Sequence, residues 1–134
     1  MNLQQWIDRI HDMAKAKGWW EVTSKSLSVS EKMSKLMLIV GEISEASEEV
    51  RKGTPIVYWN TPTGMVTLQD TGGGFNLRVG DELMKPEGEA VELADAMIRI
   101  MDYAGFRGWP LEKIIAMKVE YNATRPFRHG GKLA

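Results

Sequence analysis

Carboxylates recur at helical spacing in two segments of the sequence. These residues are Glu42, Glu45 and Glu49 in the first segment and Glu92 and Asp95 in the second. Side chains that are three, four or seven residues apart lie on one face of a helix. If the two helices pack antiparallel, carboxylates from both meet at one point, where they raise one another's pKa unless a cation is present.

Oxygen ligands without cysteine or histidine suit a hard cation, Mg²⁺ with Mn²⁺ as a substitute. A di-iron carboxylate bundle would instead require Glu-x-x-His pairs. The two histidines, His11 and His129, do not lie three residues after a glutamate. The alternative interpretation is a solvated acidic helix face, as EASEEVRK alone would indicate.

A second polar strip lies near the end of the chain. Its members are Lys118, Tyr121, Asn122 and Arg125, spaced i, i+3, i+4 and i+7. Two cations, an amide and an aromatic ring can bind a phosphate chain together with a sugar or base. An ordinary amphipathic surface is the other interpretation. Trp20 could stack on a base, although neighbouring tryptophans also serve as core or interface anchors.

Composition limits the classes of protein that are compatible with the sequence. The 134 residues include 17 basic and 18 acidic side chains, which argues against a protein held to nucleic acid by phosphate contacts. The absence of cysteine excludes disulfides and thiolate metal sites. The longest apolar run, 36–40, is too short to cross a membrane, and the first ten residues do not resemble a signal peptide. We expect a single cytoplasmic domain over 1–134.

Hydrophobic spacing predicts four helices. The first begins near Leu3 and ends at Gly18; the second follows a capping box at Ser28 and Glu31 and ends before Gly53. The third follows Pro86 and ends at Gly105, and the fourth begins at Pro110. The region 54–84 is β-branched and rich in glycine, with strands predicted at 56–59, 65–68 and 75–79. The expected fold is all-α, with a β-hairpin or small meander inserted in a four-helix bundle and a basic tail at 123–134.

Four segments together resemble the all-α nucleoside triphosphate pyrophosphohydrolases of the MazG type. They read HDMAKAKGWW, EKMSKLMLIVGEISEASEEVRKG, KPEGEAVELADAMIRIMDYAG and KVEYNATRPFRHGGK. The resemblance covers nearly the whole chain outside 54–84. It implies a helical bundle that assembles as a dimer or tetramer. It also implies Mg²⁺-dependent hydrolysis of nucleoside triphosphates to the monophosphate and pyrophosphate, for house-cleaning or control of nucleotide pools.

The resemblance also implies roles for individual residues. The metal ligands would be Glu42, Glu45, Glu92 and Asp95. Lys118 and Asn122 would contact the nucleotide, and Lys118 and Arg125 would stabilise its phosphates during the reaction. Beyond these implied roles, our hypothesis for the mechanism is that either Glu45 or Glu49 orients the attacking water.

The sequence departs from the family pattern at two places. Gly41 stands where many relatives have a further glutamate, for which Glu49 could substitute. The insertion could act as a lid, as an oligomer contact or as a base-recognition element through Tyr58 or Trp59. Two alternatives stay open: a hydrolase of an alarmone such as ppGpp, and a non-catalytic helical dimer.

Overall fold

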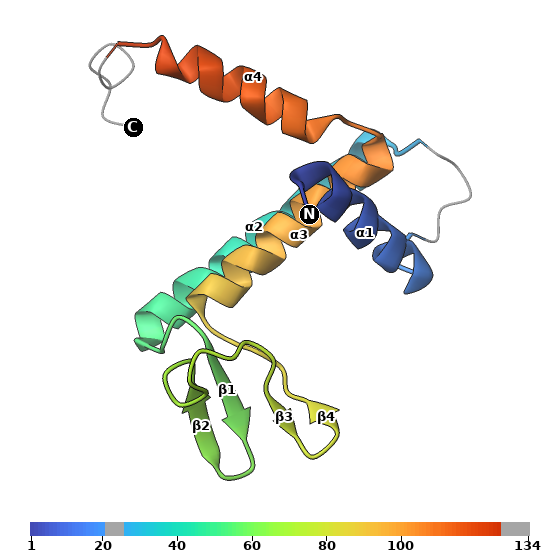
Figure 1. Cartoon of the computed structure of the whole chain (residues 1–134). Coiled ribbons are helices and arrows are strands. Elements are labelled where there is room, and N and C mark those ends of the chain that lie inside the picture. Colours follow the sequence, from blue (N-terminus) through green and yellow to red (C-terminus); the bar gives the residue numbers. More distant parts are fainter. Residues whose placement is uncertain (21–25, 127–134) are drawn as a thin grey trace. The chain divides into compact units, whose positions relative to one another are not determined.

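The computed structural model describes residues 1–20 and 26–126, within which the chain forms four helices and four short strands (Figure 1). The chain divides into two compact units. The central unit is Ser26–Ile100, and the terminal unit combines Met1–Lys25 with Met101–Ala134. The predicted mostly helical fold is confirmed, whereas a single bundle of the four helices stays a prediction. Most of the basic tail lies outside the described residues.

Helix α2 (Val29–Lys52) of the central unit has the ends that the sequence predicts. The Ser28 hydroxyl accepts a hydrogen bond from the Glu31 backbone, and the Glu31 carboxylate accepts one from the Ser28 backbone. These bonds hold the pKa of Glu31 below its usual value. Gly53 ends the helix at φ 69°, a left-handed conformation that glycine adopts without a steric penalty. Local capping chemistry therefore fixes both boundaries.

The region 54–84 corrects the expected single hairpin or meander, because it forms two separate antiparallel two-stranded sheets. Strand β1 (Tyr58–Thr61) pairs with β2 (Gly64–Thr67), and β3 (Arg78–Val79) pairs with β4 (Glu82–Leu83). The predicted third strand, 75–79, is thus reduced to two residues. Turns at 69–74, which include three consecutive glycines, separate the sheets, and Gly80 permits the tight turn of the second.

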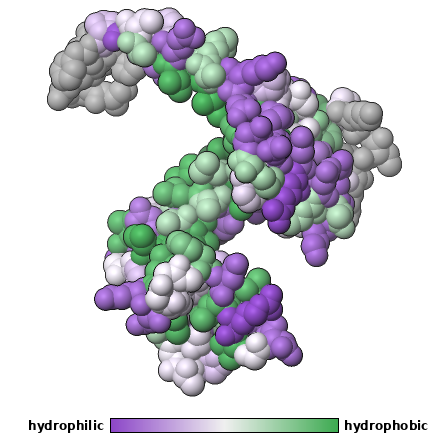
Figure 2. Space-filling view, viewed as in Figure 1, coloured by the Kyte–Doolittle hydropathy of each residue, from purple (hydrophilic) through white to green (hydrophobic). Residues whose placement is uncertain are grey.

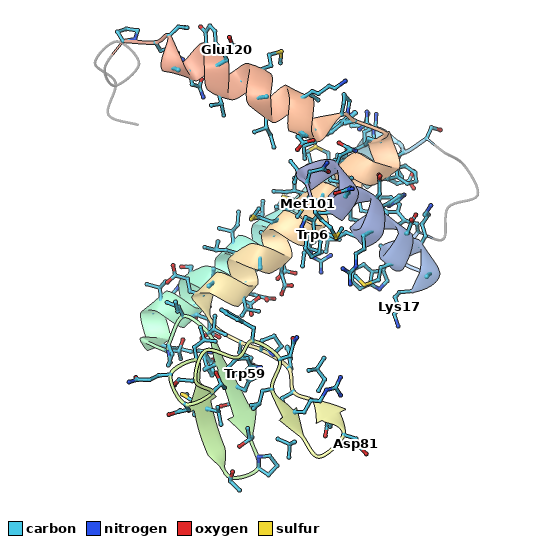
Figure 3. All side chains as sticks on the ribbon, viewed as in Figure 1. Trp6, Lys17, Trp59, Asp81, Met101 and Glu120 are labelled. Carbon is cyan, nitrogen blue, oxygen red and sulfur yellow. The ribbon has the colours of Figure 1, made fainter. Side chains whose placement is uncertain are left out.

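Backbone hydrogen bonds join the first sheet to the segment that precedes the third helix. Tyr58 and Glu87 exchange two backbone hydrogen bonds of 2.8 Å, next to the start of α3 (Glu89–Arg107). Trp59 is 1% exposed and lies where the strands meet the helix ends, while Asp81 lies at the outer tip of the second sheet (Figure 3). Tyr58 and Trp59 are therefore buried anchors of the insertion, and neither ring is open for stacking on a base.

Helix α3 continues past the predicted end at Gly105, so that prediction is wrong. Gly105 lies against α1 (Leu3–Ala16), and a Cβ atom there would come within 2.7 Å of the His11 side chain. The glycine allows the two helices to approach closely. Gly108, at φ 68°, takes the left-handed conformation just after the helix.

The terminal unit has a small core. Its buried hydrophobic residues are Ile7, Ile10, Ala14, Tyr103 and Ala104. Helix α4 (Leu111–Ala123) follows Pro110 and contacts α1, but it contains no buried residue. Among the described residues, no helix combines the length and the apolar character needed to cross a membrane.

Candidate metal centre

Helices α2 and α3 of the central unit lie side by side (Figure 1), and three of their carboxylates meet. Glu42 contributes from α2, and Glu92 and Asp95 contribute from α3. One oxygen of each lies within 4.8 Å of the other two. The predicted convergence of carboxylates from the two helices is therefore present for these three residues, which we call the acidic cluster.

Glu45, the fourth predicted ligand, borders the acidic cluster through its contact with Glu92. Burial, a side-chain hydrogen bond with Glu45 and the charges of the neighbouring carboxylates together raise the pKa of Glu92 from 4.5 to about 7. A hydrogen bond between two carboxyl groups requires one of them to hold a proton. Without a cation, the site therefore retains a proton near neutral pH.

Arg99 is a positively charged neighbour of the acidic cluster that the sequence analysis did not identify. Its Nε donates a 2.7 Å hydrogen bond to Glu42 Oε1, and the Glu42 side chain is only 12% exposed. Burial and the charge of Glu42 raise the pKa of Asp95, and the positive charge of Arg99 opposes this increase. The spacing in the sequence could have identified Arg99, because it lies four residues after Asp95 and therefore on the same helix face.

The residues present fit a hard divalent cation. Each member of the acidic cluster offers an oxygen, and the distances between these oxygens suit ligands that share one ion. Burial foremost, and then the charges of the neighbouring carboxylates, raise the pKa of Glu92 and Asp95, so these carboxyls ionise less readily than free ones. A divalent cation would offset both effects, and Glu42, Glu92 and Asp95 would hold it.

Glu49, predicted as a water-orienting residue or substitute ligand, lies outside the acidic cluster. Its carboxylate accepts hydrogen bonds from the Thr54 hydroxyl and, at 2.9 Å, from the Tyr58 hydroxyl. These donors, Thr54 foremost, lower its pKa. Burial and the bond to Glu49 raise the pKa of Tyr58. Glu49 thus connects the end of α2 to strand β1.

The residues predicted to bind the nucleotide lie on or near α4, in the terminal unit. Lys118 Nζ lies 4.9 Å from the centre of the Tyr121 ring, and the Arg125 guanidinium carbon lies 5.9 Å from it. Asn122 is exposed on the same helix. Three of the four predicted residues therefore form one cation–aromatic group.

Trp20 belongs to a different cluster, which sequence reasoning did not find. Its Nε1 donates to both oxygens of buried Asp102, at 2.9 and 3.0 Å, and His11 Nδ1 lies 2.7 Å from one of them. The Trp20 ring stacks on Phe106 with 4.1 Å between centroids. One face of the ring is therefore already covered. The sequence IMDYAG places the Asp102 carboxylate among apolar residues, and this pattern could have indicated that Asp102 is buried.

Comparisons of the chain with protein-family models, with curated proteins and with solved structures find no match.

Proposed function

We propose that the protein is a Mg²⁺-dependent hydrolase that converts nucleoside triphosphates to the monophosphate and pyrophosphate in the cytoplasm. The observation that carries this proposal is the acidic cluster, in which Glu42, Glu92 and Asp95 converge from two helices. The resemblance of the sequence segments to MazG-type pyrophosphohydrolases supplies the reaction class. A bound Mg²⁺ would neutralise charge on phosphate oxygens and acidify water.

In the proposed reaction, the oxygen of a water molecule forms a bond to the α-phosphorus, and the bond from that phosphorus to the bridging oxygen breaks. Pyrophosphate leaves with the bridging oxygen. Glu45 accepts the proton of the water, because it borders the acidic cluster through its contact with Glu92. Glu49 is less suited to this role, since Thr54 and Tyr58 occupy its carboxylate.

In the proposal, Arg99 positions one of the metal ligands. Its guanidinium holds Glu42 at 2.7 Å and so fixes the orientation of one metal ligand. The contacts of Lys118, Tyr121, Asn122 and Arg125 with nucleotide remain a separate prediction from the family resemblance. Measuring nucleotide affinity for Lys118→Ala tests them independently of the metal.

We also propose that the protein self-associates, as a dimer or tetramer. Helix α2 exposes a stripe of large hydrophobic side chains, each between 43% and 58% accessible. The stripe consists of Met33, Leu36, Met37, Val40 and Ile43. Figure 2 shows hydrophobic surface along the part of the molecule formed by α2 and α3. A contiguous apolar surface of this kind favours burial against a partner. Sedimentation should show an oligomer that Val40→Asp weakens.

The decisive experiment measures pyrophosphate release from ribo-, deoxyribo- and modified nucleoside triphosphates, with Mg²⁺ and with EDTA. We expect metal-dependent release together with the monophosphate. Turnover of ppGpp alone would indicate the alarmone alternative. A folded protein that is inactive on every substrate and shows no thermal shift with Mg²⁺ would contradict an enzymatic role and favour the non-catalytic dimer.

A further inference from the structure

A pocket lies in the central unit between α3 and the insertion. Its volume is about 350 Å³, which falls within the range of about 300–1,000 Å³ for small-molecule sites. Its lining residues from α3 are Ala90, Val91, Ala94, Asp95 and Ile98, and those from the insertion and the segment after it are Val57, Phe75 and Pro86. The spacing of the first group shows that one continuous face of α3 forms one wall.

The pocket adjoins the acidic cluster through a shared residue. Asp95 lines the pocket and also contributes an oxygen to the acidic cluster. All the other lining residues are apolar. A ligand that spans the acidic cluster and the pocket would need a cation-binding group at the cluster. In the pocket it would need an apolar group that is flat or compact.

Phe75 supplies the aromatic surface of this pocket. Phe75 is 68% exposed although it belongs to the lining, so its side chain is available to a ligand. By contrast, Tyr58 and Trp59, the aromatic residues that the sequence favoured for this task, are 6% and 1% exposed. The insertion therefore presents a different aromatic ring from the one expected.

We propose that this pocket binds the base of the nucleotide whose phosphates are held at the acidic cluster, with Phe75 contacting the base. This inference rests on the proposed function and assigns substrate selection to the 54–84 insertion. Because Asp95 is the sole polar side chain among the lining residues, the pocket selects bases by size and apolar surface rather than by hydrogen-bonding pattern.

The test compares binding of non-hydrolysable α,β-methylene nucleoside triphosphates with binding of inorganic tripolyphosphate, which lacks a base. Both are titrated calorimetrically in Mg²⁺. We expect wild-type protein to bind the nucleotide about tenfold more tightly, the scale of one base–aromatic contact. Phe75→Ala and Ala94→Leu should abolish this difference while leaving tripolyphosphate affinity unchanged. The first removes the ring and the second fills the pocket.

Val79→Ala is the matched control, because Val79 is an exposed apolar residue of the same insertion that does not line the pocket. Selection by apolar surface further predicts that a thymine nucleotide binds about fourfold more tightly than its uracil counterpart, the scale of one buried methyl group. Discrimination of a thousandfold between bases of equal size would overturn that mode of selection.

The outcomes separate this inference from the proposed reaction. Wild-type protein that releases pyrophosphate, with nucleotide binding unaffected by Phe75→Ala and Ala94→Leu, would overturn the pocket and leave the reaction standing. Base-dependent binding that both variants abolish, in a protein without pyrophosphate release, would support the pocket and contradict the reaction. Equal or undetectable binding of both ligands by wild type would overturn the pocket.

Discussion

The central unit holds half-buried carboxylates and the terminal unit holds the buried Asp102, and the surroundings of these groups differ. Asp102 in the terminal unit receives hydrogen bonds from Trp20 at 2.9 and 3.0 Å and lies 2.7 Å from His11. In the central unit, Glu92 meets other carboxylates, and its pKa rises to about 7. A buried carboxylate whose neighbours are donors stabilises a fold, whereas one whose neighbours are carboxylates favours a proton or a cation.

The largest expected effect is on turnover. Glu45→Gln should lower pyrophosphate release by about 10²–10⁴-fold, because an amide cannot accept the proton of the attacking water. The measurement is the initial rate with saturating Mg²⁺ and nucleoside triphosphate. Glu48→Gln is the control, since Glu48 is a neighbouring glutamate of α2 that pairs with Arg51 at the surface. Equal rates for wild type and Glu45→Gln would contradict the role of Glu45.

The next effect tests the cation. Mg²⁺ or Mn²⁺ at 100 times its Kd should stabilise the wild type by about 2.7 kcal/mol, because the ion binds the folded state alone. Asp95→Asn should lose most of this stabilisation, since it removes a ligand of the acidic cluster. Thermal unfolding with and without the ion measures it. Asp102→Asn, in the other unit, should retain the full response, and a loss there would break the distinction between the two carboxylate groups.

A third prediction concerns the terminal unit. Asp102→Ala should lower the free energy of unfolding by about 2 kcal/mol, because it removes the buried carboxylate that Trp20 and His11 both contact. Urea unfolding measures the change. Asp12→Ala provides the comparison, since Asp12 makes an exposed ion pair with Lys15 at 3.3 Å and should cost about 0.2–1 kcal/mol. Similar values for both variants would show that Asp102 has no special structural role.

The smallest effect is the pH dependence of the metal-free protein, because solvent screens the charges around the half-exposed Glu92. Because the pKa of Glu92 rises from 4.5 to about 7 on folding, the folded state holds more protons than the unfolded state between these values. This group's contribution to stability therefore declines as the pH rises from about 4.5 to about 7. Urea unfolding across this range should show a smaller decline in Glu92→Gln. Saturating Mg²⁺ should also reduce this decline of the free energy of unfolding with pH. An unchanged decline in both experiments would rule out Glu92 as its cause.

The helix boundaries show which ends of helices can be predicted from neighbouring residues in the sequence. The capping box at Ser28 and the closing Gly53 are local chemistry, so the sequence predicts both ends of α2. Gly105 misleads because the contact that explains it, with His11, comes from a segment more than ninety residues away. A glycine that closes a helix and one that admits a neighbouring helix look the same in the sequence.

The same distinction applies to the candidate sites. Spacing within each helix predicted that carboxylates of the two helices could meet if the helices pack antiparallel, and the structure brings together Glu42, Glu92 and Asp95. The sequence also indicated ligands that would suit a hard cation, because it offers carboxylates without cysteine. Tertiary structure alone decided that Glu49 binds Thr54 and Tyr58. It also decided that Phe75, not Trp59, is the exposed ring of a pocket. The physical reason is that spacing fixes which residues share a face, whereas contacts between distant segments decide which of them are covered.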